Sequence, residues 1–162
     1  MKSPLEKYHI DIDLIKKHIE EASVKKQQDK NLSPETFTKD TIDTYSNFAK
    51  SKMGIEFKDV TLFITALTHR SYVNEHRKAE VKHNERLEFL GDAILELVFS
   101  DFLFEHFDEP EGIMTAWRSA LVRTESIGAA SYEIGYIHLI RLSKGEKLGN
   151  SRTHASIIAD CF

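Results

Sequence analysis

Hydrophobic side chains recur at helical spacing along most of the chain. The N-terminal part carries a clean apolar stripe at steps of three and four, which predicts a helix over about residues 4–24. Its members are Leu5, Tyr8, Ile12, Ile15, Ile19 and Ala22. The polar residues 25–32 have no such periodicity and indicate a linker. Similar helical series continue to the C-terminus, and runs that alternate at period two are few, so the pattern predicts an all-α fold.

Capping residues and helix breakers divide the rest of the chain into helices. Ser33 and Pro34 supply an N-cap and a first-turn proline for a helix that we expect to end near Gly54. Asp59 is placed to cap the next helix, and Pro110 interrupts a long apolar series. The later predicted helices cover residues 83–107, 114–123, 124–135 and 153–162.

Residues 83–99 carry the candidate chemistry of the chain. On a helix, at about 100° per residue, Glu85, Glu88 and Asp92 fall within roughly 60° of one another, and Glu96 continues the stripe. The rest of this helix is so widely apolar that we expect it to be largely buried. Buried like charges require compensation, and carboxylate oxygens suit hard divalent cations such as Mg²⁺.

A simpler interpretation is that these acids form a solvated helix face, with Arg86 and distant lysines as partners. However, no lysine or arginine lies between Arg86 and Arg118. Counter-charge therefore cannot come from the helix itself, and cations remain the stronger hypothesis.

Composition limits the classes of protein. A chain of 162 residues with 41% hydrophobic content supports one domain with a true core. It has no apolar run of about 18 residues and no apolar N-terminal leader, so we expect no membrane association and no export. The single cysteine, Cys161, excludes a disulfide framework and favours a reducing compartment such as the cytoplasm. With a net charge of −4, any affinity for RNA needs a local basic surface, metal ions or a further segment.

Three motifs carry a family resemblance. Residues 84–92, Asn-Glu-Arg-Leu-Glu-Phe-Leu-Gly-Asp, match the signature helix of ribonuclease III along their whole length. Residues 68–71, Thr-His-Arg-Ser, resemble the motif that precedes this helix in the family, and residues 144–146 resemble its Gly-Glu turn. The match runs over about residues 48–162. The resemblance implies a catalytic domain over 33–162, incomplete at its C-terminal end, after a helical extension and linker over 1–32.

The resemblance also implies an activity. Members of the family are homodimeric, Mg²⁺-dependent endonucleases of double-stranded RNA, in which Mn²⁺ can replace Mg²⁺. They leave 5′-phosphate and 3′-hydroxyl ends and process RNA, including ribosomal RNA precursors. The family usually adds a double-stranded-RNA-binding domain, which this chain lacks, so the basic surface that binds RNA would lie elsewhere.

Site residues follow from the same resemblance. Glu88, Asp92 and Asp160 are implied as metal ligands, and Glu85 as a further catalytic acid. Asp160 follows the apolar Ile157–Ile158–Ala159 run, where a merely structural acid would be poorly placed. The family has an Asp-x-x-Glu pair here, and the chain ends one residue before that glutamate. We therefore expect the chain alone to be weakly active or inactive, and extension through a glutamate to restore cleavage.

Three further positions have a structural and a functional interpretation. Arg70 could contact an RNA phosphate, although a His-Arg pair at a helix end more often serves capping and hydrogen bonding. Phe89 matches the aromatic residue that packs into the other subunit of family dimers, whereas composition alone would place it in the core. Glu111 matches an acid that approaches the site of the partner subunit.

Two rival functions stay open. The first is a non-catalytic ribonuclease III-like module that serves a structural or RNA-binding role, although such a module would have no need of four clustered acids. The second is an all-α nucleotide pyrophosphatase, which also aligns acidic pairs on helices. The matches over residues 84–92 and 68–71 argue against this second function.

Overall fold

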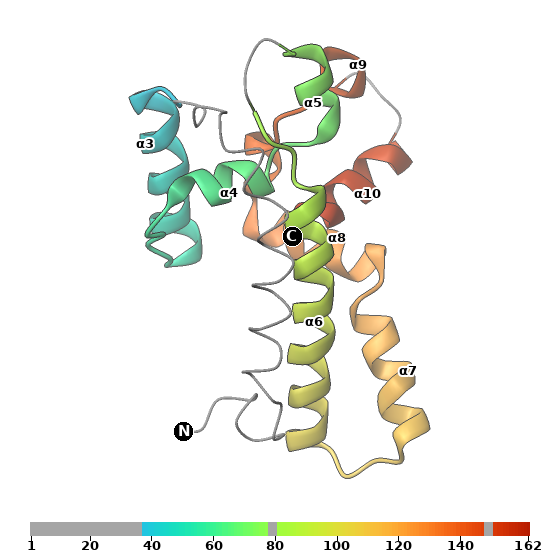
Figure 1. Ribbon diagram of the computed structural model, residues 1–162. Coiled ribbons are helices and arrows are strands. Elements are labelled where there is room, and N and C mark those ends of the chain that lie inside the picture. Colours follow the sequence, from blue (N-terminus) through green and yellow to red (C-terminus); the bar gives the residue numbers. More distant parts are fainter. Residues whose placement is uncertain (1–36, 78–80, 148–150) are drawn as a thin grey trace, which may run out of the picture. The chain divides into compact units, whose positions relative to one another are not determined.

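The computed structural model describes residues 37–77, 81–147 and 151–162 (Figure 1). The chain divides into two compact units, Met1–Pro34 and Glu35–Phe162, and every described residue belongs to the second. The predicted helix and linker over residues 4–32 lie outside the described residues. The elements in chain order are α3 (Lys39–Phe48), η2 (Ala49–Met53), α4 (Val60–Ala66), α5 (Arg70–Glu75), α6 (Glu85–His106), α7 (Glu111–Leu121), α8 (Thr124–Ile134), η3 (Tyr136–Leu139), α9 (Lys144–Lys147) and α10 (Ser151–Asp160).

The prediction of an all-α fold is confirmed for this unit. The regular elements of its described part are all helices. The β-type backbone pairing in this part is one isolated parallel bridge between Thr68 and Arg141. Among the described residues, no helix is long and apolar enough to cross a bilayer.

Local capping explains where several helices begin and end. The Asp59 carboxylate accepts a hydrogen bond from the Thr61 amide at 2.9 Å and so caps α4, as predicted. Gly54 ends η2 with φ of 69°, also as predicted. The prediction for the start of α3 is wrong, because residues 37 and 38 are not helical and Thr38, not Ser33, is the cap. The Thr38 hydroxyl accepts from the Thr41 amide, which ends the extended segment before the helix.

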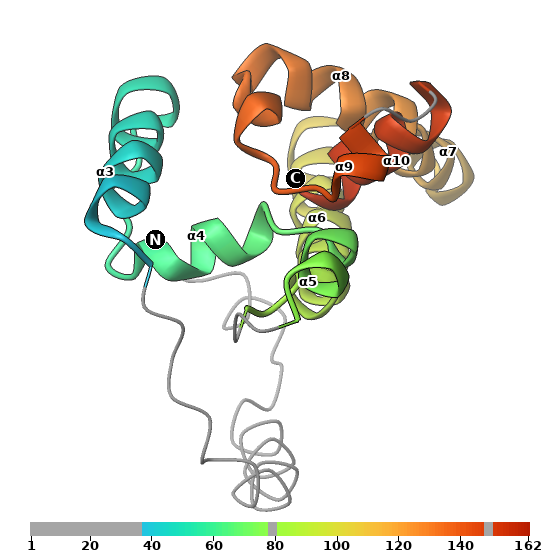
Figure 2. The same ribbon diagram turned by 90° about the horizontal axis from the view of Figure 1, so that it is seen from above.

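The core of the unit forms where α3, α4, η3 and α10 meet. Its buried members include Tyr45, Phe63, Ile64, Leu139 and Ile158. Tyr45 packs edge-on against Phe63 and donates a hydrogen bond from its hydroxyl to the Leu139 carbonyl at 2.5 Å. Seen from above, α3 and α4 lie on one side and α8 and α10 on the other (Figure 2).

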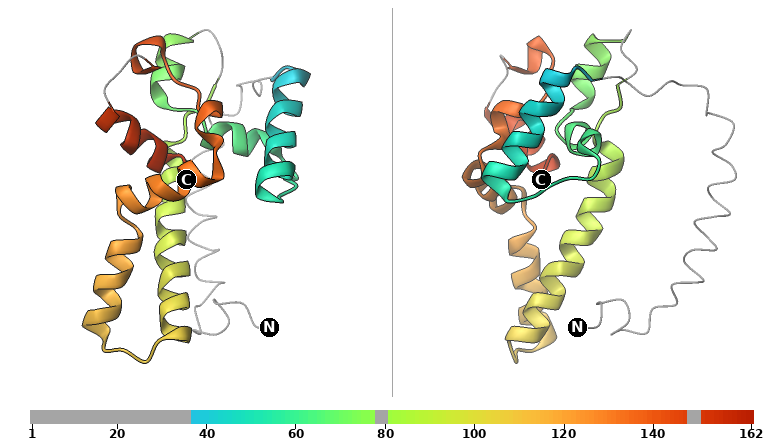
Figure 3. Two further views of the ribbon diagram at one scale, coloured as in Figure 1. Left: turned by 180° about the vertical axis from the view of Figure 1, so that it is seen from behind. Right: turned by 90° about the vertical axis from the view of Figure 1, so that its left-hand side faces the viewer.

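The long helix α6 is far less buried than its composition predicted. It runs beside α7, and the far ends of this pair extend away from the other helices of the unit (Figure 3). Leu103 is its only buried residue among those described. The prediction of a largely buried helix is therefore wrong for a single chain. The physical reason is that a wide apolar coat shows that a helix needs cover, but not that the same chain supplies it.

Candidate active site

Two helix ends meet where the predicted acids lie. Glu85 and Glu88 occupy the first turn of α6, and Asp160 is the last residue of α10. A direct contact joins these ends, because the Asn84 side-chain amide donates to the Asp160 carbonyl oxygen at 3.3 Å. Figures 1 and 2 show the end of α10 beside the beginning of α6. Asp92 follows one turn after Glu88. The helix dipole favours negative charge in a first turn, so α6 accommodates its two leading acids there.

The acids influence one another electrostatically. Partial burial raises the pKa of Glu88 above its ordinary value, and the neighbouring charges of Asp160, Glu85 and Asp92 raise it further. Burial also raises the pKa of Asp160, while nearby His69 and a hydrogen bond from Ser156 oppose that shift. The Glu88 carboxylate forms no hydrogen bond or ion pair with any described residue. Carboxylates from two helices thus share a region where their negative charge is only partly compensated.

Glu85 differs from its neighbours because a cation faces it. The Arg70 guanidinium lies 3.3 Å from one carboxylate oxygen of Glu85 and donates a hydrogen bond to it. Nδ1 of His83 lies 3.6 Å from the other oxygen, and within the described residues this buried nitrogen has no hydrogen-bond partner. The side chains of Arg70 and Glu85 are 66% and 44% exposed, so both can reach a ligand from solvent.

His69 caps α5, which bears out the structural interpretation of the His-Arg pair. Its Nδ1 accepts from the Ser71 amide at 3.2 Å, and the Ser71 hydroxyl accepts from the Ser143 amide at 3.1 Å. Burial lowers the pKa of His69, although the charges of Glu146 and Asp160 act in the opposite direction. The histidine therefore stands near the acids while it holds the start of α5 against the segment before α9.

Arg141 fixes the same loop from the other side. Its backbone amide donates to the Leu67 carbonyl at 2.7 Å, and its carbonyl accepts from the His69 amide at 3.1 Å. Its guanidinium lies over the Tyr72 ring, 4.2 Å from the centroid, and donates to the Tyr72 hydroxyl at 2.9 Å. Sequence reasoning missed this residue, because an arginine in an irregular segment gives no periodic signal.

The side chains of these acids have the right chemistry to bind a divalent ion, but they are not already arranged around one point. Carboxylate oxygens are the ligands that Mg²⁺ prefers, and it commonly keeps several waters beside one or two carboxylates. The raised pKa of Glu88 shows a local excess of negative charge that such an ion would neutralise. Across the described residues, however, no three His, Cys, Asp or Glu side chains already converge on one point. Glu88, Asp92 and Asp160 are the residues that could hold an ion here.

Two predicted interface residues are not members of this cluster. Phe89 is 83% exposed, so the composition-based placement in the core is wrong for a single chain. Glu111 opens α7 and accepts a hydrogen bond from the Thr115 hydroxyl. It follows the far end of α6, about 27 Å along that helix from Glu88 at 1.5 Å per residue. Glu111 therefore cannot join the acids of its own protomer.

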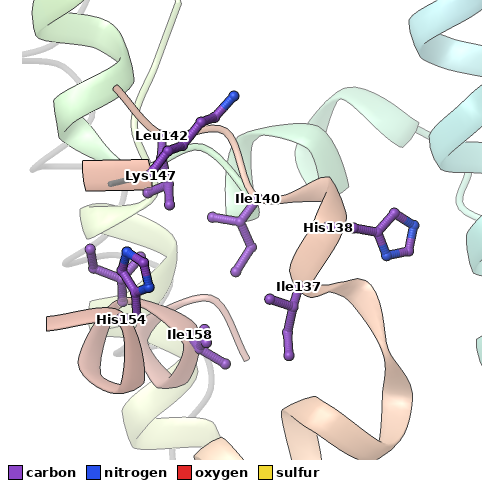
Figure 4. A pocket seen from close by; sticks show the side chains of 8 residues that line it. Ile137, His138, Ile140, Leu142, Lys147, His154 and Ile158 are labelled. Atoms are coloured by element: carbon purple, nitrogen blue, oxygen red, sulfur yellow. The ribbon is translucent and has the colours of Figure 1, made fainter. Parts of the chain in front are cut away.

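One cavity among the described residues lies elsewhere. It measures about 260 Å³ and lies among η3, α9 and α10 (Figure 4). Aliphatic side chains dominate its wall, and none of its lining residues is acidic. They are Ile137, His138, Ile140, Leu142, Lys147, His154, Ile157 and Ile158. This cavity is therefore separate from the acids on α6 and α10.

Comparison with known proteins matches the chain to the ribonuclease III family. A family model described as ribonuclease-III-like matches residues 59–162. Ribonuclease 3 of Streptococcus gordonii is 46% identical over 117 residues, which cover 72% of this chain and 50% of that protein. Ribonuclease 3 of Enterococcus faecalis is 48% identical over 114 residues, which cover 70% and 50%. The chain spans about half the length of the curated relatives it matches.

Solved structures point the same way. One nuclease domain of ribonuclease III from Campylobacter jejuni superposes with a TM-score of 0.61 and 35% identity, over 70% of this chain and 76% of that one. Its study concerns structural flexibility in the region involved in dimer formation. A second structure of the domain, from the same organism, has a TM-score of 0.58 and 32% identity over 78% of each chain.

Proposed function

Because the chain belongs to the ribonuclease III family, we propose that its domain hydrolyses double-stranded RNA with the help of Mg²⁺, or of Mn²⁺ in its place. The observation that carries the proposal is the meeting of Glu88 on α6 with Asp160 on α10, where each carboxyl group has a raised pKa. Duplex RNA is recognised mainly by its shape and backbone, so no base-reading motif is needed.

The acids divide into two roles in this proposal. Glu88, Asp92 and Asp160 would hold the divalent ion, which supplies Lewis-acid stabilisation and a more acidic bound water. Glu85 would orient groups at the scissile phosphate. Arg70, which is exposed and paired with Glu85 at 3.3 Å, would exchange this partner for an RNA phosphate oxygen.

We also propose that two protomers act together. Phe89, Leu90, Ile94 and Val98 are all at least half exposed on α6, which is typical of a surface that a partner covers. A second copy would place its Glu111 near the acids of the first, which no contact within one protomer achieves. The products would carry 5′-phosphate and 3′-hydroxyl ends, and the substrates would be cytoplasmic precursors such as ribosomal RNA.

Substitution of one acid tests the catalytic proposal. Asp92→Asn should reduce duplex cleavage by more than about a hundredfold, since it removes a metal ligand without changing the shape of the side chain. The substitution is made in the chain extended through a glutamate after Phe162, because we expect the shorter chain to be weakly active or inactive. Single-turnover assays with excess protein and Mg²⁺ measure the rates. The control is Asp43→Asn on α3, which removes one exposed acid far from the site and should leave the rate unchanged. Equal rates for all three proteins would contradict the proposal.

One observation keeps the non-catalytic module as a second candidate. The described acids do not form a ready-made site of three ligands. A module of this kind would bind duplex RNA, bind no Mn²⁺ above the level of Asp92→Asn, and leave the RNA intact. Mn²⁺ titration followed by electron paramagnetic resonance separates the two candidates without relying on cleavage.

A further inference from the structure

Asn84 stands in the ordinary position of a helix cap but does not cap. It immediately precedes α6, where asparagine side chains usually accept a hydrogen bond from the second or third amide of the helix. The Asn84 side chain makes no such bond, and its backbone has the right-handed helical φ and ψ of −76° and −16°. The residue is nevertheless only 2% exposed. A buried side-chain amide that does not bond to its own helix needs a hydrogen-bond partner elsewhere.

The other partner is the end of α10. The Asn84 Nδ2 donates to the Asp160 carbonyl oxygen at 3.3 Å and to the Cys161 sulfur at 3.4 Å. The last carbonyl groups of a helix have no partner within it, so the Asp160 carbonyl needs a donor from outside. Because a carbonyl oxygen only accepts, this contact also fixes which end of the amide faces α10.

The backbone of Asn84 is held as firmly as its side chain. Its amide donates to the Thr68 carbonyl at 2.9 Å, and its carbonyl accepts from the Glu88 amide at 2.9 Å. Thr68 is itself fully buried and belongs to the bridge with Arg141. Asn84 is therefore the point at which the loop before α5, the first turn of α6 and the end of α10 are joined.

We propose that Asn84 is a positioning residue that sets the separation between the acids of α6 and Asp160, and thereby the affinity of the site for a divalent cation. The inference rests on the proposed function, because it needs these acids to share an ion. Outer-shell partners of metal ligands typically account for a factor of 10–100 in metal affinity. Asn84 would act in this way through the backbone of one ligand and the first turn that carries another.

Mn²⁺ binding to the full chain tests the inference without cleavage. Asn84→Leu keeps the branched shape and removes the donor, and Asn84→Ala removes the donor together with bulk. We expect each to weaken Mn²⁺ binding by roughly tenfold or more, measured by electron paramagnetic resonance on protein shown to be folded by circular dichroism. If the leucine variant does not fold, the alanine variant answers the same question.

Two control variants separate positioning from a general loss of stability. Tyr45→Phe also removes one buried hydrogen bond to a carbonyl oxygen, but in the core away from the acids, and should leave the Mn²⁺ affinity within about twofold. Cys161→Ala removes the weaker contact of Asn84 together with a small volume of the core, and should also stay within about twofold.

The outcomes keep the two proposals apart. If the parent chain and Asp92→Asn bind Mn²⁺ equally, the proposed function fails. If the parent binds Mn²⁺ specifically and both Asn84 variants bind it as tightly, the proposed function stands and the positioning role is overturned. Weaker binding in Tyr45→Phe of the same size as in Asn84→Leu would also overturn it.

Discussion

Glu88 carries its charge where burial and its acidic neighbours both disfavour it. Its pKa in the folded state lies above the ordinary value of 4.5, so the folded protein binds a proton here more readily than the unfolded chain does. Stability therefore falls as the pH rises from the ordinary pKa through the raised one. At neutral pH the ionised Glu88 side chain therefore destabilises the folded state to its full extent. Glu56 is the opposite case, because its hydrogen bond and ion pair with Lys50 lower its pKa.

Glu88→Gln should consequently separate activity from stability. In the absence of divalent ions at pH 7, we expect the free energy of unfolding to rise slightly, by no more than about 0.5 kcal/mol because the side chain is largely exposed to solvent. Cleavage and Mn²⁺ binding should be lost. Urea unfolding at pH 4 and pH 7 measures the effect, which should disappear at the lower pH.

The matched control is Glu56→Gln, for which the sign reverses. A lowered folded pKa stabilises the protein above the ordinary pKa, so this substitution should reduce stability at pH 7 and lose its effect as the pH falls. If Glu88→Gln instead destabilises the protein at pH 7, as Glu56→Gln does, the claim that burial and acidic neighbours destabilise the ionised Glu88 is contradicted.

At the scale of the elements, α8 shows how backbone conformation decides the effect of one methyl group. Gly128 lies inside the helix, whereas Gly135 ends it with φ of 84°. A Cβ atom at either position would meet no atom within 4 Å other than those of the adjacent residues or of the helix's own backbone. The two sites thus differ in backbone conformation and not in the space available.

Alanine substitution at these two glycines should have opposite effects. Gly135→Ala forces a side chain into the left-handed region and should cost about 1–2 kcal/mol. Gly128→Ala removes backbone freedom from the unfolded chain and should stabilise by about 0.4–1 kcal/mol. Thermal unfolding of both variants measures the difference. A loss of stability in both would indicate crowding at Gly128 and would contradict the open space beside it.

The sequence predicted elements well where a local interaction decides them. Asp59 and Gly54 act through their own neighbours, so the start of α4 and the end of η2 were predictable. Pro110 correctly predicted a break after α6, but α7 begins at Glu111 and not at the predicted residue 114. The start of α3 was misplaced because local rules favour Ser33, which is followed by Pro34, over Thr38, whereas the helix is capped by Thr38. Asn84 was missed for a related reason. An asparagine before a helix predicts a cap, and nothing in its neighbours points to α10, 76 residues away.

The sequence predicted that the acids of α6 share one helix face, but not how they come together with Asp160 in one site. Helical periodicity places Glu85, Glu88 and Asp92 on one face, whatever the rest of the chain does. Their meeting with Asp160 depends on long-range contacts through Asn84, Thr68 and Arg141, which spacing does not encode. The resemblance named Asp160 as a ligand, and the structure adds the contacts that hold its backbone beside α6.

At the scale of the whole described unit, the exposed apolar face of α6 is the feature that the described residues leave unexplained. Phe89 is 83% exposed, Leu90 55% and Val98 54%. Large contiguous apolar surfaces are costly in water and usually mark an interface. The proposed homodimer would cover this face and bring the two distant kinds of acid, Glu88 and the Glu111 of a partner, into one site.

Two leucines of equal exposure make this proposal testable. Leu90 on α6 and Leu62 on α4 are each 55% exposed, so an aspartate at either position meets similar solvent in a single chain. Burial of one leucine side chain contributes about 1.5–3 kcal/mol, and each 1.4 kcal/mol changes a dissociation constant tenfold. Leu90→Asp should therefore weaken self-association at least tenfold in sedimentation equilibrium, whereas Leu62→Asp should not change it. Equal weakening by both variants would show that the interface involves α4 as much as α6. No weakening by either would contradict the homodimer and indicate that a different partner covers the face of α6.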